Sequence, residues 1–490
     1  MITYQDYERA VAENRLLKWL GASIINYRNS TEYKEAERQE LYILGRNPDI
    51  MNALRVIYSA TGVPLRDFTA ANHRIASKKC HRFVSQRCTY SLGNGISFTK
   101  HLEDTRNADG STTTVDTTKQ ALGRDFDRSI YKLAYWGTAN DEAYLFIQKG
   151  HEQDKLEYTV FRRTEFLALK DENTGALRGG IRFWSLDWKK RPVTAVLYTE
   201  EGLTKYRTKE GKYGVMDMEE IEPLTPYIQQ VSELGNGELE IVGEVPVSTI
   251  PIFAFSSNDQ HVSALENVIP AVYATDMIMS GFADDIDDCA QIYWAVSGAM
   301  GMEADDLDKM RDRFKFLHIM QIDGEHSSAT PVTVEPPYQS RESCLKMLNQ
   351  KLYDDFGALD VHTIQAGATN DHIDAAYQCM DEEADDFEYQ LSGVIYQILD
   401  MLGIDDEPEY KRNKVSNQKE QTEMVLSAYG ENVIDRQTAV KKLSWITVDE
   451  VDGILDRMDA QDVADKRDME KLRKEMEEEN GQAREDGEED

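Results

Sequence analysis

Four aspartates near the middle of the chain are the side chains most closely spaced for chemistry. Asp284, Asp285, Asp287 and Asp288 fall within five consecutive positions, and carboxylates gathered in this way can hold two Mg²⁺ ions for phosphoryl transfer. In a nuclease the carboxylates converge on a cleft from separate elements, whereas neighbours on one helix point in different directions around its axis. We therefore expect no catalysis at this cluster.

The cysteines and histidines do not have the spacing of a metal site. The five cysteines are odd in number and widely separated, which is typical of reduced thiols rather than of a disulfide framework. Cys80 is followed by His81, but no second pair stands at the spacing that a zinc site needs. We expect no metal and no cofactor.

Catalytic motifs are absent from the sequence. The chain has no G-x-x-x-x-G-K-[ST], no G-x-G-x-x-G, no G-x-S-x-G and no H-E-x-x-H. The helices expected within 418–460 could be mistaken for a helix-turn-helix, but acidic residues flank them. We expect a protein that is not an enzyme and does not read DNA bases directly.

The charge of the chain limits its partners. Its 490 residues hold 55 Lys and Arg against 89 Asp and Glu, a formal charge of -34, and 41% are hydrophobic, enough for a globular multidomain protein. A protein that binds DNA tightly is normally basic on its contact surface. Either nucleic acid is not the partner, or the protein contacts it without holding it.

No apolar run is long enough to span a membrane, so no membrane contact is expected.

The first half of the chain is expected to be helical and then β-rich. Helical spacing marks 16–27, 31–45 and Ala71 to Tyr90, the last being the most basic stretch of the protein. From about 155 to 257, β-branched and aromatic runs alternate with turn signals. This pattern predicts an antiparallel meander.

Two long acidic helices are expected at 265–289 and 371–402. Each has an apolar seam with heptad spacing. The second seam includes Tyr377, Met380, Phe387, Leu391, Val394 and Ile398. The two helices hold fifteen acids and no Lys or Arg, so their acids are expected to repel one another. They are either ordinary solvated faces or a negative wall that several copies present together.

A small α/β module is expected between these helices. IYWAV (292–296) and FLHIMQI (316–322) have the composition of strands, and 341–357 has helical spacing. Further helices are expected at 418–430, 435–445 and 447–460. The last sixteen residues hold nine acids and one Arg, the composition of a disordered tail.

This order of elements resembles the tailed-bacteriophage portal proteins, and in particular the portal family of long-tailed Bacillus phages. HRFVSQRCTYSLGNGISF (81–98) is similar to the family's basic helix and following strand, and IYKLAYWGTANDEAYLFI (130–147) to its A-x-x-x-G-x-A-Y segment. The segment 245–288 resembles its strand and following helix, with Asp276 and Ser280 at the end of that pattern.

The resemblance covers about residues 20–460 and implies an α+β, multidomain portal fold. Its parts would be a wing at 1–264, helical and then β-rich; a stem helix at 265–290; a small α/β clip at 291–340; a second stem helix at 341–361; a tunnel loop at 362–371; a long wing helix and its connector at 372–414; a helical crown at 415–465; and an acidic disordered tail at 466–490. GATNDHIDAAY (367–377) replaces the S-G-x-A that is common before the long helix, which leaves the bounds of the tunnel loop open.

The resemblance also assigns roles to residues. The acids that would line a channel are Asp276, Asp284, Asp285, Asp287 and Asp288. The tunnel loop would present Gln365, Ala366, Gly367, Ala368, Thr369 and Asn370. The seam of 371–402 would pack between neighbouring subunits or domains.

The implied function is a conduit for double-stranded DNA. Portals are similar rings of twelve subunits at one capsid vertex, so the resemblance implies a virion protein made in the host cytoplasm. Its expected partners are the terminase large subunit, scaffolding and major capsid proteins and a head-tail connector. The acidic charge suits this role, because each phosphate contact with Lys or Arg would have to be broken as DNA moves.

Two other functions remain open from the sequence. One is a nuclease or hydrolase fused to a helical oligomerisation module, which turnover of nucleic acid in Mg²⁺ would support. The other is a helical scaffold protein without a role on DNA. Only the portal predicts a closed ring of about twelve subunits.

Overall fold

The computed structural model describes most of the chain. It covers residues 2–469 except 55, 59–63, 67–70, 107–111, 150–155, 186–191, 210–216, 228, 234–238, 245–249, 290–292, 298–327, 333–337, 362–368, 415–417, 432, 444–450, 452, 456, 459, 462–465 and 468.

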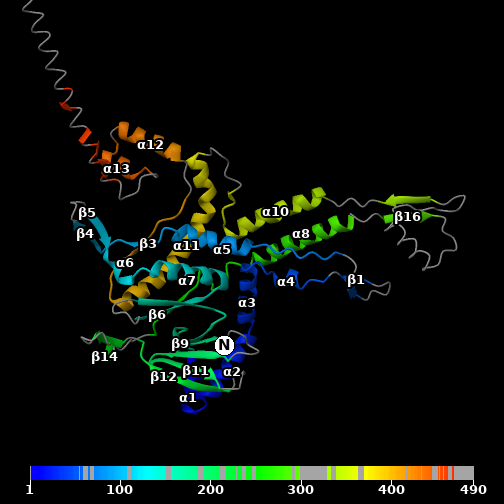
Figure 1. The fold of residues 1–490 in the computed structure, drawn as a ribbon, viewed down its shortest axis with the longest axis horizontal. Helices are drawn as coiled ribbons and strands as arrows, with labels where there is room; N and C mark the ends of the chain where they lie inside the picture. Colours follow the sequence, from blue (N-terminus) through cyan, green and yellow to red (C-terminus); the bar gives the residue numbers. More distant parts are fainter. Residues whose placement is uncertain are drawn as a thin grey trace, which may run out of the picture.

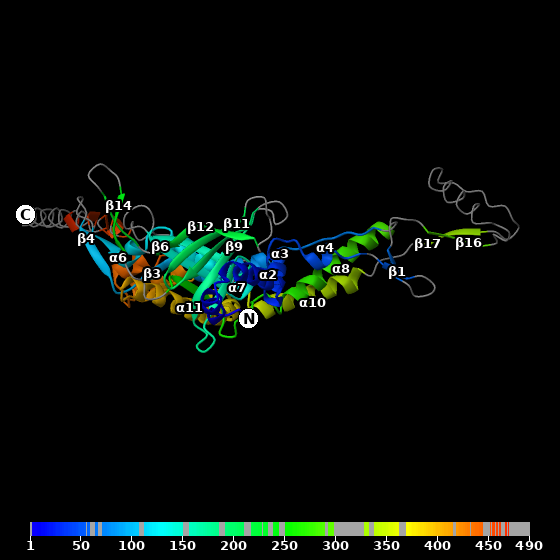
Figure 2. The same cartoon turned by 90° about the horizontal axis from the view of Figure 1, so that it is seen from below.

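Two antiparallel sheets with helices on both outer faces form the body of the molecule (Figures 1 and 2). The five-stranded sheet has the order β12-β11-β10-β9-β8, and the three-stranded sheet has the order β15-β6-β7. The strands of the first are β8 (Phe166–Lys170), β9 (Leu177–Trp184), β10 (Thr194–Thr199), β11 (Gly202–Thr208) and β12 (Met218–Thr225). Those of the second are β6 (Ala143–Lys149), β7 (Leu156–Arg162) and β15 (Ile252–Phe255). The expected meander is confirmed, although β6 begins before the expected β-rich region.

Alternating side chains of β10 show how the layers pack. Ala195 and Leu197 belong to the core that joins the larger sheet to the N-terminal helices. Val196 and Tyr198 belong to the core between the two sheets. Because side chains alternate across a strand and both faces are covered, the whole run must be apolar.

Three N-terminal helices cover the outer face of the larger sheet (Figure 1). They are α1 (Tyr4–Ala12), α2 (Leu16–Asn29) and α3 (Thr31–Ile43). Thr3 and Asp6 form a capping box at α1, and the Ser30 hydroxyl accepts a hydrogen bond from the backbone N–H of Tyr33 to begin α3. The two helices expected from 16 and 31 are confirmed.

The basic stretch expected as one helix from Ala71 to Tyr90 is only partly helical. A short helix α4 (Pro48–Met51) precedes it, residues 71–78 are not helical, and α5 spans Lys79–Leu92. The expectation is wrong for residues 71–78, because several of their backbone N–H groups bind side chains of α8 (Ile269–Cys289) instead of carbonyls one turn away.

The main core lies between the smaller sheet and the helices on its outer face. These helices include α5, α7 (Phe126–Asn140) and α11 (Asn370–Leu402), with the short α6 (Thr117–Leu122) nearby. Phe255 of β15 packs edge-on against Phe387 of α11 at 5.8 Å between ring centroids. The six seam residues of α11 are all buried within the single chain: Tyr377, Met380, Phe387, Leu391, Val394 and Ile398.

Two helices project together from this body, α8 and α10 (Tyr338–Phe356) (Figures 1 and 2). Beyond them β16 (Tyr293–Ser297) pairs antiparallel with β17 (Ser328–Val332). The expected strand at 292–296 is confirmed, while the one expected at 316–322 lies outside the described residues.

The chain after α11 returns to the body and then forms a second helical group. β18 (Pro408–Tyr410) pairs with β3 (Ile96–Phe98), and α12 (Gln418–Gly430) is followed by α13 (Arg436–Lys441). Three short hairpins complete the described strands: β1 (Val56–Tyr58) with β2 (Pro64–Arg66), β4 (Leu102–Arg106) with β5 (Thr112–Asp116), and β13 (Gln229–Glu233) with β14 (Leu239–Glu244). Much of the helix expected at 447–460, and the final residues 470–490, lie outside the described residues.

Candidate functional site: the helix pair α8 and α10

Helices α8 and α10 are joined by aromatic and ionic contacts as well as by apolar packing. The ring of Phe282 meets that of Tyr338 edge-on at 5.3 Å between centroids. The Arg341 guanidinium lies 5.6 Å from the centre of the Phe282 ring and forms an ion pair with Asp285. A groove of about 1090 Å³ runs between these helices and α5. The pair is therefore a braced projection of the body.

Asp276, the first of the predicted channel acids, is buried inside the subunit. Its side chain is on α8, and the residue is only 2% exposed. The Asn47 side-chain amide donates to it at 2.9 Å, and the backbone N–H of Ser77 donates at 3.2 Å. The prediction that Asp276 lines a channel is therefore wrong, because its carboxylate satisfies donors of two other segments.

The extended segment 71–78 follows α8 in the opposite direction. The N–H of His73 donates to Asp284 at 2.6 Å, and that of Ile75 donates to the Ser280 hydroxyl at 2.9 Å. With Ser77 and Asp276, these bonds form a ladder of three rungs. Two residues of an extended chain span about 6.6 Å, and four residues of a helix span about 6 Å. Every second N–H of the segment 71–78 can therefore reach every fourth side chain of α8.

The ladder was missed in the sequence, although a signal for it exists. Asp276, Ser280 and Asp284 are polar residues spaced four apart, which places them in one row beside the apolar seam of α8. Two of them also end the portal-like pattern 245–288. What the sequence does not reveal is the partner of this row, which lies about 200 residues earlier in the chain.

Three further acids of α8, Asp284, Asp285 and Asp287, have nitrogen-bearing side chains of other elements beside them. The two ring nitrogens of His73 lie 2.8 Å from Asp284 and 3.3 Å from Asp287, and Asp285 pairs with Arg341. The side chain of Asp288 lies outside the described residues. The expectation that these acids only repel one another is wrong, because the compensating groups lie outside the helix. Whether Asp284, Asp285 and Asp287 face a channel stays a prediction.

The acids of α11 are likewise bound by the connector that follows it. Arg412 contacts Asp381 at 3.0 Å and Glu388 at 2.8 Å and also pairs with Asp385, while Lys414 lies 2.6 Å from Asp381. Burial opposes ionisation of Asp381, but hydrogen bonds from Lys414 and Tyr90 outweigh it and lower its pKa. The connector therefore holds part of the acidic face of α11.

The seam of α11 and the tunnel loop also depart from their expected places. The seam was expected to pack between neighbouring subunits or domains. Its residues pack against other elements of the same chain, so no neighbouring subunit is needed to bury it. Thr369 is the residue before α11, and Asn370 is its first residue, so the last two residues of the expected loop, 370 and 371, are already helical. Gln365, Ala366, Gly367 and Ala368 lie outside the described residues.

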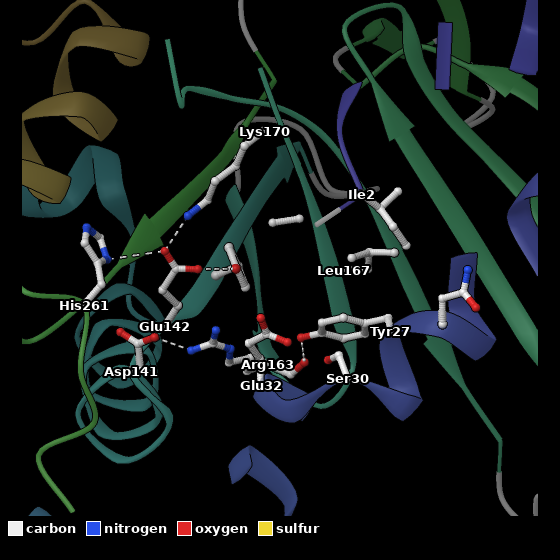
Figure 3. Close-up of a pocket in the computed structure, with 13 residues that line it drawn as sticks. Ile2, Tyr27, Ser30, Glu32, Asp141, Glu142, Arg163, Leu167, Lys170 and His261 are labelled. Atoms are coloured by element: carbon white, nitrogen blue, oxygen red, sulfur yellow. Dashed lines mark hydrogen bonds and ion pairs between the residues drawn. The ribbon is translucent and has the colours of Figure 1, made fainter. Parts of the chain in front are cut away.

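A second cavity of about 380 Å³ lies where the N-terminal helices meet the sheets (Figure 3). Its charged side chains satisfy one another: Lys170 lies 2.6 Å from Glu142, and Arg163 pairs with Asp141. Burial opposes ionisation of Glu142, but Lys170 outweighs it and keeps its pKa low, whereas burial raises the pKa of Asp141. These ion pairs connect neighbouring elements inside the subunit, and the sequence spacing did not predict them.

The described residues offer no obvious chemistry of another kind. None of their His, Cys, Asp and Glu side chains form a group of three or more that could hold a metal ion. In the same part of the chain, no helix is both long and apolar enough to cross a membrane.

Comparison with known proteins gives the class of this fold. Residues 22–482 match the family model described as phage portal protein, SPP1 Gp6-like. The portal protein of Clostridium phage phiCD119 is 22% identical over 431 residues, covering 84% of this chain and 90% of that protein. The portal protein of Bacillus phage SPP1 is 23% identical over 347 residues, covering 69% of this chain and 63% of that protein.

Two solved structures with partial similarity to this fold come from gene transfer agent particles. A chain in the virion of a native gene transfer agent particle has a TM-score of 0.42 and 10% identity and covers 83% of this chain and 100% of its own length. A chain in the neck of an empty gene transfer agent particle has a TM-score of 0.44 and 11% identity and covers 82% and 99%. The assignment rests on the sequence family, not on these likenesses.

The chain therefore belongs to the phage portal proteins of the SPP1 Gp6-like family. The resemblance found in the sequence is confirmed. The family is a structural one, and neither alternative function is favoured.

Proposed function

We propose that this protein forms a closed ring of about twelve subunits at one capsid vertex, through which double-stranded DNA is packaged and later leaves. The family match over residues 22–482 carries this proposal. Terminase, scaffolding and major capsid proteins and a head-tail connector are its proposed partners in the virion, after synthesis in the host cytoplasm. Its role is structural rather than catalytic.

The parts of the fold suit the parts of such a ring. We assign α8 and α10 as the stem, the β16–β17 segment to the clip, and the two sheets with their N-terminal helices to the wing. Helix α11 returns from the stem to the wing, and α12 and α13 belong to the crown. The hydrogen-bond ladder and the ion pair that brace this projection suit a part that surrounds a moving polymer.

The charge supports passage rather than tight binding. The chain carries -34 formal charges, and phosphate contacts by Lys and Arg are what make DNA binding tight and salt-dependent. Exposed acids such as Asp287, whose side chain is 58% exposed, would keep the duplex from adhering. Asp285 would contribute less to this repulsion, because the Arg341 guanidinium is paired with it.

The first test is the mass of the purified full chain. A closed ring of twelve copies of a 56.0 kDa chain should give particles of about 670 kDa by mass photometry. A stable monomer or dimer at micromolar concentration would contradict the proposal.

A further inference from the structure

Part of the surface beside α5 is lined without carboxylates, which is unusual in so acidic a chain. Two cavities of about 510 and 420 Å³ adjoin this helix and share His81 as a lining residue. Neither cavity has an Asp or Glu among its lining residues. Among the described residues, the lining of these two adjoining cavities is thus free of acids, although the whole chain holds 89.

Cationic and apolar side chains occupy this surface together. We name it the basic patch and define it by six residues: Leu44, Lys78, His81, Arg82, Lys132 and Trp136. Lys78 and Lys132 are exposed and form no ion pair with any residue that the structure describes. Leu44 is 54% exposed beside them. An apolar and aromatic centre with a polar, charged rim is typical of a protein interface.

A surface of opposite charge lies on α11. We name the exposed residues Gln378, Glu382, Asp386 and Tyr389 the acidic stripe. Arg412 and Lys414 bind other acids of the helix, and neither Glu382 nor Asp386 forms an ion pair within the described part of the chain. Tyr389 is 75% exposed at the end of the stripe.

The patch and the stripe of one chain cannot meet each other. The seam of α11 faces the body, where Tyr377 stacks on Tyr90 of α5 at 5.6 Å between ring centroids. Each residue of a helix is turned by about 100° from the one before it. Glu382 and Asp386 each follow a buried residue of α11 by two positions, so they lie on nearly the opposite side of the helix. The stripe therefore points away from α5. Two complementary surfaces on different sides of one chain are what a head-to-tail ring contact requires.

We propose that the basic patch of one subunit docks on the acidic stripe of a second copy of this chain. This inference rests on the ring that is proposed above and names the surfaces that close it. The exposed Leu44 and Tyr389 would supply apolar area, and the opposite charges would fix the register and reject other partners.

The test is an exchange of charges between the two surfaces. The double variants Lys78→Glu/Lys132→Glu and Glu382→Lys/Asp386→Lys should each raise the subunit concentration for half-maximal ring assembly by about tenfold or more, because like charges then face each other. The variant with all four changes restores opposite signs and should assemble nearly as the wild type does.

A matched control and a fold check make the result specific. Lys18→Glu/Lys34→Glu changes the net charge equally at exposed positions of α2 and α3 and should leave assembly unchanged. Circular dichroism spectra and the melting temperatures of dissociated subunits should stay the same in all variants. If a charge reversal disturbs folding, Lys78→Ala/Lys132→Ala gives the same test with a smaller expected shift.

The remaining outcomes would overturn either the docking or the proposed function. Assembly of either double variant at the wild-type concentration would overturn the docking, and so would failure of the fourfold variant beside an assembling control. Intact Lys78→Glu/Lys132→Glu rings that lose only affinity for a short DNA duplex at low salt would make the patch a DNA contact and also overturn it. Failure of the wild type itself to form rings would instead reject the proposed function.

Discussion

Asp406 joins the connector after α11 to the body of the subunit. Its buried carboxylate accepts a hydrogen bond from the Thr118 hydroxyl at 2.6 Å and from the backbone N–H groups of Lys100 and Glu407, both at 2.8 Å. Burial opposes ionisation, but these bonds, led by that from Thr118, hold the pKa of Asp406 well below its usual range. A single ionised side chain thus fixes the connector to two other segments, at Lys100 and at Thr118.

This arrangement predicts a pH-dependent loss of stability. Because the folded pKa is depressed, the stabilisation by Asp406 is present above the unfolded value of about 3.9 and is lost as the pH falls toward the folded value. Asp406→Asn should therefore unfold at lower urea than the wild type at about pH 7, and the difference should shrink at about pH 3. Asp405→Asn, whose carboxylate is 92% exposed, is the control and should be nearly neutral. An equal loss of stability towards urea in Asp406→Asn at both pH values would contradict this explanation.

At the scale of elements, the orientation of α8 depends on a segment that is not helical. Residues 71–78 have no regular structure of their own, yet their N–H groups match the side chains of α8 rung by rung. Asn47, which begins α4, adds a second donor at Asp276 beside the N–H of Ser77. The projecting helix is therefore anchored at its base by the chain that leads into α5.

Removal of the buried carboxylate should weaken this anchor. Asp276→Ala leaves the donors of Asn47 and Ser77 buried without an acceptor, which costs about 1–3 kcal/mol for each group. The measurement is the free energy of unfolding in urea. Met277→Ala changes the neighbouring residue, which is 49% exposed, and should cost far less. Equal costs for the two variants would show that the ladder does not stabilise the fold.

The sequence predicted helices and strands well where the spacing of hydrophobic residues alone determines them. The heptad spacing of Phe387 and Leu391 correctly predicted a long helix with one buried face, because burial of that face is a local property of the sequence. The same pattern could not say whether another subunit or the same chain covers the face. Residues 71–78 have helical spacing too, but the acceptors on α8 compete for their N–H groups, and no local pattern contains those acceptors.

At the scale of the whole molecule, the negative charge is distributed less simply than a count suggests. Both acidic helices lack Lys and Arg, and this absence predicted an uncompensated wall. Arg341, Arg412 and Lys414 come from other segments and neutralise part of it. A count along one helix cannot include cations that folding brings to it. Nor can it include neutral donors such as the Asn47 amide and the Ser77 N–H, which hold Asp276 inside the subunit.

The most direct test of the account is a reconstruction of the purified full-length particle by electron cryomicroscopy. The account predicts a closed ring with α8 and α10 nearest the central axis, the β16–β17 segment at one end of the bore and the sheets at the periphery. A ring that places α8 and α10 on its outer circumference, or a particle without a central channel, would show that this helix pair does not surround DNA.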